Sequence, residues 1–135
     1  MRPIHLVSLI LLTLITACQT SKNAHKHETS ETVMLTYRVK AGTETNFQNT
    51  LAEAWRIYRG AHLVFEHPHI IVSDKDKTGG TRVTEIFTWV SANAPDHAPD
   101  SVKKIWERMH ALCEDRAGQK GLTGGEVELI TPHPH

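Results

Sequence analysis

The hydrophobic positions of this chain alternate in several stretches and recur with a helical period in others. Residues 33–40 (VMLTYRVK) place apolar side chains on one face and mostly polar ones on the other, which is typical of a β-strand. Residues 61–90 predict two more strands, joined by the polar, glycine-rich turn DKDKTGG. Pro68 interrupts the first of these and indicates an edge strand or a bulge. The second, from Val83 onward, carries bulk on both faces, which predicts a central strand.

Two amphipathic helices separate these strands. Thr45 and Gln48 have the spacing of a capping box at the start of the first helix, and Gly60 predicts its end. The apolar stripe of this helix consists of Phe47, Leu51, Ala54 and Tyr58. Between Pro99 and Arg116 a second stripe has helical spacing, and it consists of Val102, Ile105, Trp106, Met109, Leu112 and Cys113.

The order of elements predicts an α+β fold. The glycine-rich sequence RAGQKGLTGG predicts a turn after the second helix, and EVELITP, residues 126–132, predicts the last strand. Strand, helix, strand, strand, helix, strand is the ferredoxin-like βαββαβ arrangement, with one four-stranded antiparallel sheet and both helices on one face. The other face then needs a cover. Because the third strand is bulky on both sides, we expect a second copy of the chain there, as a homodimer.

The first residues of the chain have the layout of a secretory signal. Arg2 precedes the apolar run HLVSLILLTLITA, and a small residue comes before the expected cleavage. The apolar run over residues 6–17 is about 12 residues, shorter than the roughly 20 that a membrane-spanning helix needs. The ending ITAC resembles the lipobox of bacterial lipoproteins, which implies palmitate and diacylglycerol-type lipidation of Cys18. Gln19 favours the outer membrane, with the protein facing the periplasm.

These observations divide the chain into four parts. We predict a signal peptide at residues 1–17, a lipidated cysteine and flexible tether at 18–32, a folded domain at 33–131 and a tail at 132–135. The tether contains no large apolar residue and cannot bury surface. An ordinary cleaved signal and a retained anchor remain the alternatives. With 15 basic and 15 acidic residues the net charge is zero, which does not favour a nucleic-acid partner.

Two pieces of the chain resemble the dimeric α/β-barrel superfamily, which includes the antibiotic-biosynthesis-monooxygenase-like proteins. The first is YRVKAGTETNFQNTLAEAW, residues 37–55, which resembles the opening strand and helix of that group. The second is the pattern W-x-S-x-x-A followed by a histidine, represented here by Trp89, Ser91, Ala94 and His97. Family members carry the histidine nine residues after the tryptophan, and here the separation is eight.

The resemblance implies two paired ferredoxin-like sheets with a pocket between each sheet and its helices. Some relatives oxidise polycyclic aromatic molecules with oxygen and no cofactor, so we expect no cofactor here. Haem-degrading relatives use an asparagine, a tryptophan and a histidine around the haem. The first strand of this chain has no asparagine, with Thr36 and Arg38 in that region instead, which does not favour haem degradation.

Four residues are the candidate catalytic set: Glu85, Trp89, His97 and His110. His97 lies between two prolines at the entry to the second helix, where it could act as a general base or simply bond the local backbone. His110 lies at one edge of the second stripe and could face a pocket or the solvent. Glu85 is the odd polar member of its strand face, as an exposed end, a paired carboxylate or a site residue. Trp89 could line a cavity or belong to the core.

The chain has ten histidines, which raises the question of metal binding. His67 and His69 share a face if Pro68 leaves the strand extended, but two ligands do not make a site. His25 and His27 are better explained as part of a solvated tether. Three hypotheses therefore stay open: a monooxygenase-like enzyme or binder of a small apolar or aromatic molecule, a non-catalytic envelope scaffold, and a histidine-based haem or metal binder.

Overall fold

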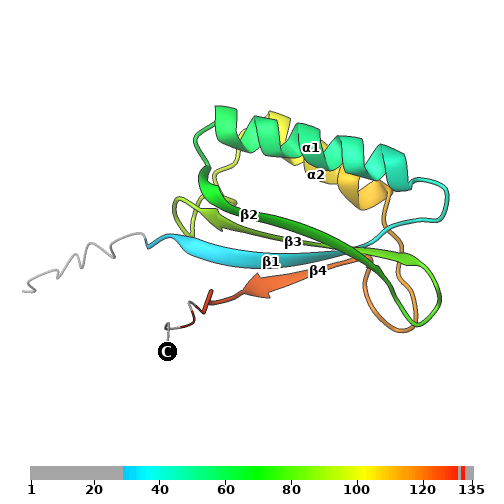
Figure 1. Ribbon diagram of the computed structural model, residues 1–135. Helices are drawn as coiled ribbons and strands as arrows, with labels where there is room; N and C mark the ends of the chain where they lie inside the picture. Colours follow the sequence, from blue (N-terminus) through cyan, green and yellow to red (C-terminus); the bar gives the residue numbers. More distant parts are fainter. Residues whose placement is uncertain (1–28, 131, 133–135) are drawn as a thin grey trace, which may run out of the picture.

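The computed structural model describes residues 29–130 and 132, and it contains four strands and two helices (Figure 1). In chain order the elements are β1 (Glu31–Arg38), α1 (Glu44–Gly60), β2 (Val64–Lys75), β3 (Thr81–Trp89), α2 (Asp100–Ala111) and β4 (Leu122–Glu126). The predicted signal peptide, Cys18 and the tether as far as residue 28 lie outside the described residues. Within them, no helix is both long and apolar enough to cross a membrane.

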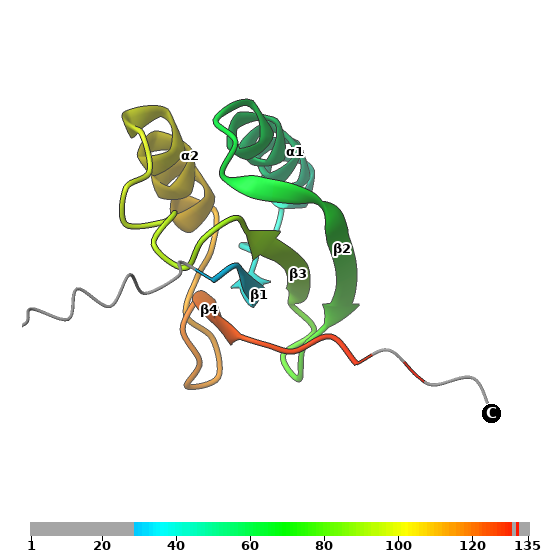
Figure 2. The same ribbon diagram turned by 90° about the vertical axis from the view of Figure 1, so that its left-hand side faces the viewer.

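The four strands form one antiparallel sheet in the order β2-β3-β1-β4. Both helices lie side by side on one face of this sheet, and the other face is uncovered (Figure 2). This confirms the predicted α+β, ferredoxin-like βαββαβ fold. The central position of β3 follows from its sequence, because only a strand with neighbours on both sides and a helix layer above buries so many of its side chains.

The core lies between the sheet and the helices. The predicted stripe of α1 is buried in full, and so are Val102, Ile105 and Met109 of α2. From the sheet, alternate residues of β1 and β3 face the helices: Val33 and Tyr37, then Val83, Phe87 and Trp89. Period-2 strands and period-3.6 helices therefore bury the side chains that their patterns select.

Several boundaries differ from the prediction. β1 begins at Glu31, two residues early, and ends at Arg38 instead of Lys40. The helix α1 begins at Glu44 and its N-cap position is Thr43, so the prediction that Thr45 starts a capping box is wrong. The Thr43 hydroxyl donates a hydrogen bond to the carbonyl oxygen of Lys40, which fixes the turn before the helix. Pro68 does mark an edge strand with a bulge, because the β2–β3 register shifts between Val64 and His69.

The last strand lies earlier than predicted. β4 is Leu122–Glu126, which includes the two glycines that the sequence predicts to lie in a turn, whereas residues 127–130 are not a strand. The physical reason is the packing against β1. A Cβ atom at Gly124 would collide with Cδ2 of Leu35 and would lie 3.1 Å from the carbonyl oxygen of Met34. Gly124 therefore marks a close approach of two strands, and it is not a turn residue.

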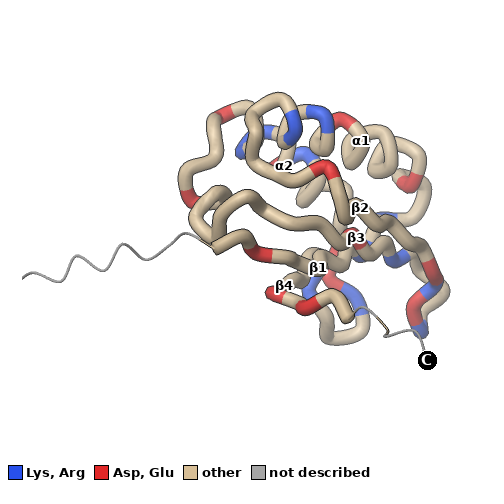
Figure 3. Tube along the Cα trace, turned by 60° about the vertical axis from the view of Figure 1, so that its left-hand side comes forward, with Lys and Arg blue, Asp and Glu red and all other residues tan. Residues whose placement is uncertain are grey.

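Acidic and basic residues occur in both the helices and the strands (Figure 3). Ion pairs connect neighbouring elements: Arg108 to Glu53 joins the two helices at 2.9 Å, and Arg59 to Glu66 joins α1 to β2 at 3.0 Å. Exposed pairs of this kind contribute little stability on their own. The stability of the domain therefore comes mainly from its apolar core, and these surface ion pairs add little to it.

Candidate functional site

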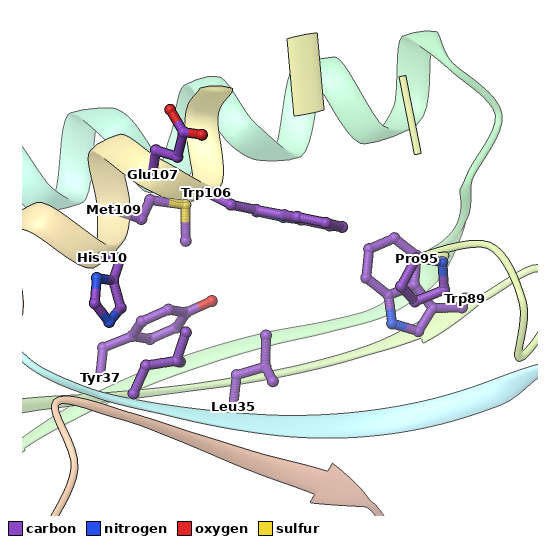
Figure 4. Close-up of a pocket in the computed structure, with 9 residues that line it drawn as sticks. Leu35, Tyr37, Trp89, Pro95, Trp106, Glu107, Met109 and His110 are labelled. Carbon is purple, nitrogen blue, oxygen red and sulfur yellow. The ribbon is translucent and has the colours of Figure 1, made fainter. Parts of the chain in front are cut away.

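An apolar cavity of about 500 Å³ lies between α2 and the sheet (Figure 4). Its volume is within the roughly 300–1,000 Å³ of small-molecule sites in proteins. The residues that line it are Leu35, Tyr37, Trp89, Pro95, Trp106, Glu107, Met109, His110 and Leu122. Nearly all of the atoms that these residues present to the cavity are apolar, so a ligand that fits it must itself be mainly apolar.

The local patterns of the sequence bring these residues together. Leu35 and Tyr37 are alternate residues of β1, and both face the helices. Trp106, Met109 and His110 are at positions i, i+3 and i+4 of α2, so they lie on one side of that helix. In Figure 4 the indole ring of Trp106 extends across the cavity toward Trp89, and the His110 ring points toward Tyr37 at the opposite end.

The tryptophan wall of the cavity is held by a hydrogen bond and by ring contacts. Nε1 of Trp106 donates to the hydroxyl oxygen of Tyr58 at 2.6 Å. The rings of Trp89 and Trp106 meet edge to face with their centroids 6.3 Å apart. The centroid of the Tyr58 ring lies 5.5 Å from that of Trp89. Edge-to-face packing of this kind is favourable and keeps the rings in one orientation. The cavity therefore has a fixed aromatic side.

A buried carboxyl group lies behind the cavity. Glu85 is a polar residue on the core-facing side of β3, and it is only 1% exposed. The Tyr37 hydroxyl donates to its Oε2 at 3.0 Å, and Nε2 of His69 lies 3.0 Å from its Oε1. A buried polar group of this kind is tolerated only when it is hydrogen-bonded in this way. Of the three readings of Glu85, the structure therefore shows the paired carboxylate.

His69 is fixed from two directions. Its ring stacks on Trp55 with centroids 3.5 Å apart and an angle of 11° between the planes, while Nε2 meets Glu85. Sequence reasoning treated His69 only as a metal candidate with His67, which is exposed. The signal that could have found the pair is register: Ile71 lies opposite Glu85, so His69 is a diagonal neighbour of Glu85 on the same face.

Burial alters the acidity of the neighbouring phenols. Burial, followed by the nearby Glu85 carboxyl, raises the pKa of Tyr37 well above its ordinary value of about 10. Burial likewise raises the pKa of Tyr58, with Glu85 as the second cause. Both tyrosines therefore stay protonated near neutral pH. Burial also raises the pKa of the Cys113 thiol to about 11, which makes it a weak nucleophile.

A second hollow, a groove of about 410 Å³, lies between α1 and β2. Trp55 and His69 line it from the two elements, with Ile71 and Ser73 farther along the strand and Arg56 on the helix. Tyr37 lines the cavity and His69 lines the groove, and Glu85 lies between these two residues. The three side chains thus connect the two hollows.

The four candidate residues from the sequence have different positions. Trp89 and His110 line the cavity, and Glu85 is bonded to its wall through Tyr37. His97 is exposed in the turn before α2 and does not line the cavity. Among residues 29–130 and 132, no group of three or more histidine, cysteine, aspartate or glutamate side chains could hold a metal ion.

Comparison with solved structures identifies proteins of the same fold. SnoaB from Streptomyces nogalater, a cofactor-independent oxygenase, superimposes with a TM-score of 0.57 and 16% identity, covering 79% of this chain and 99% of its own. A putative antibiotic biosynthesis monooxygenase from Bacteroides thetaiotaomicron gives a TM-score of 0.56 and 13% identity, covering 80% and 96%. The domain has the fold of the antibiotic-biosynthesis-monooxygenase-like proteins.

The same fold also occurs in an enzyme with a different activity. Hydroxynitrile lyase from Passiflora edulis superimposes with a TM-score of 0.51 and 10% identity, covering 78% of this chain and 99% of its own. No family model and no curated protein sequence matches the chain. The fold is therefore shared, while the reaction must be argued from the residues of the site.

Proposed function

We propose that this monooxygenase-like domain binds a small apolar, aromatic molecule in the cavity between α2 and the sheet. The observation that carries the proposal is the lining of this hollow, because nearly all of the surface around its volume of about 500 Å³, beside Trp89 and Trp106, is apolar. The edges and faces of the two indole rings match a flat aromatic ligand. A non-catalytic scaffold would be expected to fill this space with side chains.

The test is saturable binding of 1-methoxynaphthalene, measured by equilibrium dialysis against the purified full chain. We expect about one molecule per chain. Leu122→Trp should weaken binding at least about tenfold, because the larger side chain enters the cavity that Leu122 lines.

Leu129→Trp is the matched control, since Leu129 is also an exposed leucine but does not line the cavity. It should bind as the unaltered protein does. Equal binding by the Leu122→Trp variant, or no saturable binding by the unaltered chain, would contradict the proposal.

Oxidation of the bound molecule is the second candidate, supported by the likeness to a cofactor-independent oxygenase. Without a cofactor the substrate must supply all four electrons that reduce O₂, so an electron-rich hydroxyarene is the suitable class. For 1-naphthol the balanced reaction is 1-naphthol plus O₂ giving 1,4-naphthoquinone plus water. Oxygen uptake that requires both the protein and 1-naphthol tests this candidate, and binding without uptake would leave the domain a binding protein.

We further propose that the domain is held at the outer membrane, facing the periplasm, by lipid on Cys18. The support is the apolar run that ends in ITAC, followed by the polar tether. The full chain should incorporate labelled palmitate and sediment with membranes, and Cys18→Ser should lose both properties. Unchanged incorporation in that variant would disprove the anchor.

A further inference from the structure

A polar hollow of about 360 Å³ lies at the hairpin end of the sheet and shares no lining residue with the cavity or the groove. In Figure 1 the β2–β3 hairpin and the loop before β4 lie side by side at this end. Four cations line the hollow, and they are Arg38 of β1, Lys77 of the hairpin, Arg82 of β3 and Arg116 of the loop. The carboxylate among the lining residues is Asp76. Positive charges thus converge here from four segments of the chain.

The strand register places two of these cations directly opposite each other. Arg38 of β1 pairs with Arg82 of β3, on the face of the sheet that points away from the helices. Like charges in this position destabilise a sheet unless another group compensates them. Arg82 is compensated, because Asp74 lies opposite it on β2 and binds its guanidinium group. Arg38 has no carboxylate partner within the described residues, although it is only 8% exposed.

The guanidinium group of Arg38 has one unoccupied edge. Its Nη1 donates to the carbonyl oxygen of Lys120 at 2.6 Å and to the Thr123 hydroxyl at 3.5 Å. Its Nε and Nη2 make no hydrogen bond to residues 29–130 and 132. In this part of the chain every buried side-chain nitrogen or oxygen has a partner, so these two atoms contact solvent. The space beside them is the hollow that Arg38 lines.

The unoccupied edge has the geometry of an oxyanion site. The Nε and Nη2 atoms of an arginine form a planar fork that binds two oxygens of one carboxylate or phosphate group. Arg82 shows this arrangement on the neighbouring strand, because its Nε and Nη2 bind the two carboxylate oxygens of Asp74. Arg38 presents the same fork without an anion. A bound anion would offset the desolvation of this buried charge, for which stability alone gives no reason.

The carboxylates beside the hollow do not cancel its positive charge. Asp76 and Glu114 both pair with Arg116, and Asp74 pairs with Arg82. Three carboxylates therefore face four cations. The other two cations of the lining have no carboxylate partner in the described part of the chain. An anion that enters the hollow would thus meet charges that are still available.

Lys77 and Arg82 supply further donors. The Lys77 side chain is exposed and makes no hydrogen bond or ion pair with residues 29–130 and 132, so its ammonium group can reach a bound anion. Nη1 of Arg82 is also unused, because Asp74 is bound by Nε and Nη2. A carboxylate ligand would use only the fork of Arg38. The additional oxygens of a phosphate group would also meet Lys77 and Arg82, which favours phosphate.

We propose that this hollow binds a phosphate group through the Nε–Nη2 fork of Arg38, together with Lys77 and Arg82. Free phosphate and a phosphate monoester present the same oxygens to these donors, so both belong to the ligand class. The site shares no residue with the apolar cavity, and it does not depend on the proposed aromatic ligand. The domain then has two separate sites, one for an apolar molecule and one for an anion.

The test is equilibrium dialysis of the purified full chain against radiolabelled inorganic phosphate at pH 7.5. Sodium chloride keeps the ionic strength constant, so that general screening does not change along the titration. We expect saturable binding of about one phosphate per chain. Glycerol 3-phosphate should displace the label if the site accepts esters, and failure to displace it would assign the site to free phosphate. Acetate should displace the label much less effectively, because it lacks the additional oxygens.

Two variants separate the fork from the general charge. Arg38→Lys keeps the charge but removes the fork, and it should weaken phosphate binding at least about tenfold. Lys77→Gln removes a cation that has no structural contact and should weaken binding at least about fivefold. The matched control is Lys104→Gln, the same change at an exposed position of α2 that does not line the hollow. It should bind phosphate as the unaltered chain does.

Three results would overturn the proposal. The first is an unaltered chain that shows no saturable phosphate binding, and the second is displacement by acetate as effective as that by unlabelled phosphate. The third is equal binding by Lys77→Gln and Lys104→Gln, because the hollow would then not be the place of binding. Should Arg38→Lys lose the native near-ultraviolet circular dichroism spectrum, Lys77→Gln decides the question, since the Lys77 side chain supports no other part of the described structure.

Discussion

At the scale of single residues, Asp76 stabilises the hairpin between β2 and β3. Its Oδ1 accepts hydrogen bonds from the Thr78 hydroxyl at 2.6 Å and the Thr78 amide at 2.9 Å, and its Oδ2 pairs with Arg116 at 2.8 Å. Arg116 also donates to the carbonyl oxygens of Val39 at 2.7 Å and Thr81 at 2.8 Å. One aspartate and one arginine thus connect the hairpin to the loop after α2.

This arrangement predicts a pH dependence of stability. The hydrogen bond from Thr78, followed by those from Arg116, holds the pKa of Asp76 well below its ordinary value. A lowered pKa in the folded state contributes stability above the ordinary pKa of about 3.9, and this contribution is lost as the pH falls toward the folded value. Asp76→Asn should therefore unfold more easily at pH 7 but lose less stability between pH 7 and pH 3, measured as urea midpoints.

Asp96→Asn is the comparison variant, because Asp96 is an exposed aspartate in the turn before α2, away from the hairpin. It should show the same acid-induced loss as the unaltered protein. An Asp76→Asn variant whose midpoint falls just as far on acidification would show that Asp76 is not among the groups that cause acid unfolding.

At this scale, part of the candidate site could be predicted from the sequence. Glu85 could be selected because a carboxyl group interrupts the apolar face of a central strand, and Trp89 because it ends that face. The partners of Glu85 could not be selected. Tyr37 and His69 are 48 and 16 residues away along the chain, and only the register of three strands shows that they meet.

At the scale of elements, the helices and the first three strands followed from hydrophobic periodicity, whereas β4 did not. Glycine lowers strand propensity, so a pair of glycines reads as a turn when only the sequence is considered. The reason for a glycine in β4 is the side chain of Leu35 on the neighbouring strand. When a residue type is required by a neighbour on another strand, the local sequence pattern does not reveal the requirement.

Adding a methyl group to each glycine of β4 tests this explanation. Gly124→Ala should lower the free energy of unfolding by about 1–2 kcal/mol, because the new Cβ pushes against Leu35 and the Met34 carbonyl. Gly125→Ala should be neutral or stabilising by up to about 1 kcal/mol, because nothing lies within 4 Å of its Cβ and the unfolded chain loses freedom. Urea denaturation measures both, and equal effects would contradict the close-approach explanation.

At the scale of the whole molecule, one face of the sheet has no helices. In register across β1, β3 and β2, Met34 lies opposite Ile86, and Ile86 lies opposite Ile70. Met34 is 39% exposed and Ile70 is 43% exposed. A continuous apolar row over three strands is the kind of surface that a protein covers with a partner. We propose that a second copy of the chain covers it, because a flat row that follows the strand register can pack against itself about a two-fold axis.

A charge in this row should therefore separate the copies. In sedimentation equilibrium the unaltered protein should have the mass of a dimer, and Ile70→Asp should weaken association at least about a hundredfold, because the symmetry places two unpaired carboxylates in an apolar contact. Ala52→Asp adds the same charge at an exposed position of α1, in the layer opposite to this face, and should leave the dimer intact. If the unaltered protein is a monomer at all concentrations, or if both variants dissociate alike, the sheet face has another role.

Retention of ligand binding by a monomeric Ile70→Asp variant would show that each cavity is complete within one chain, as expected from its lining by β1, β3, β4 and α2 of that same chain.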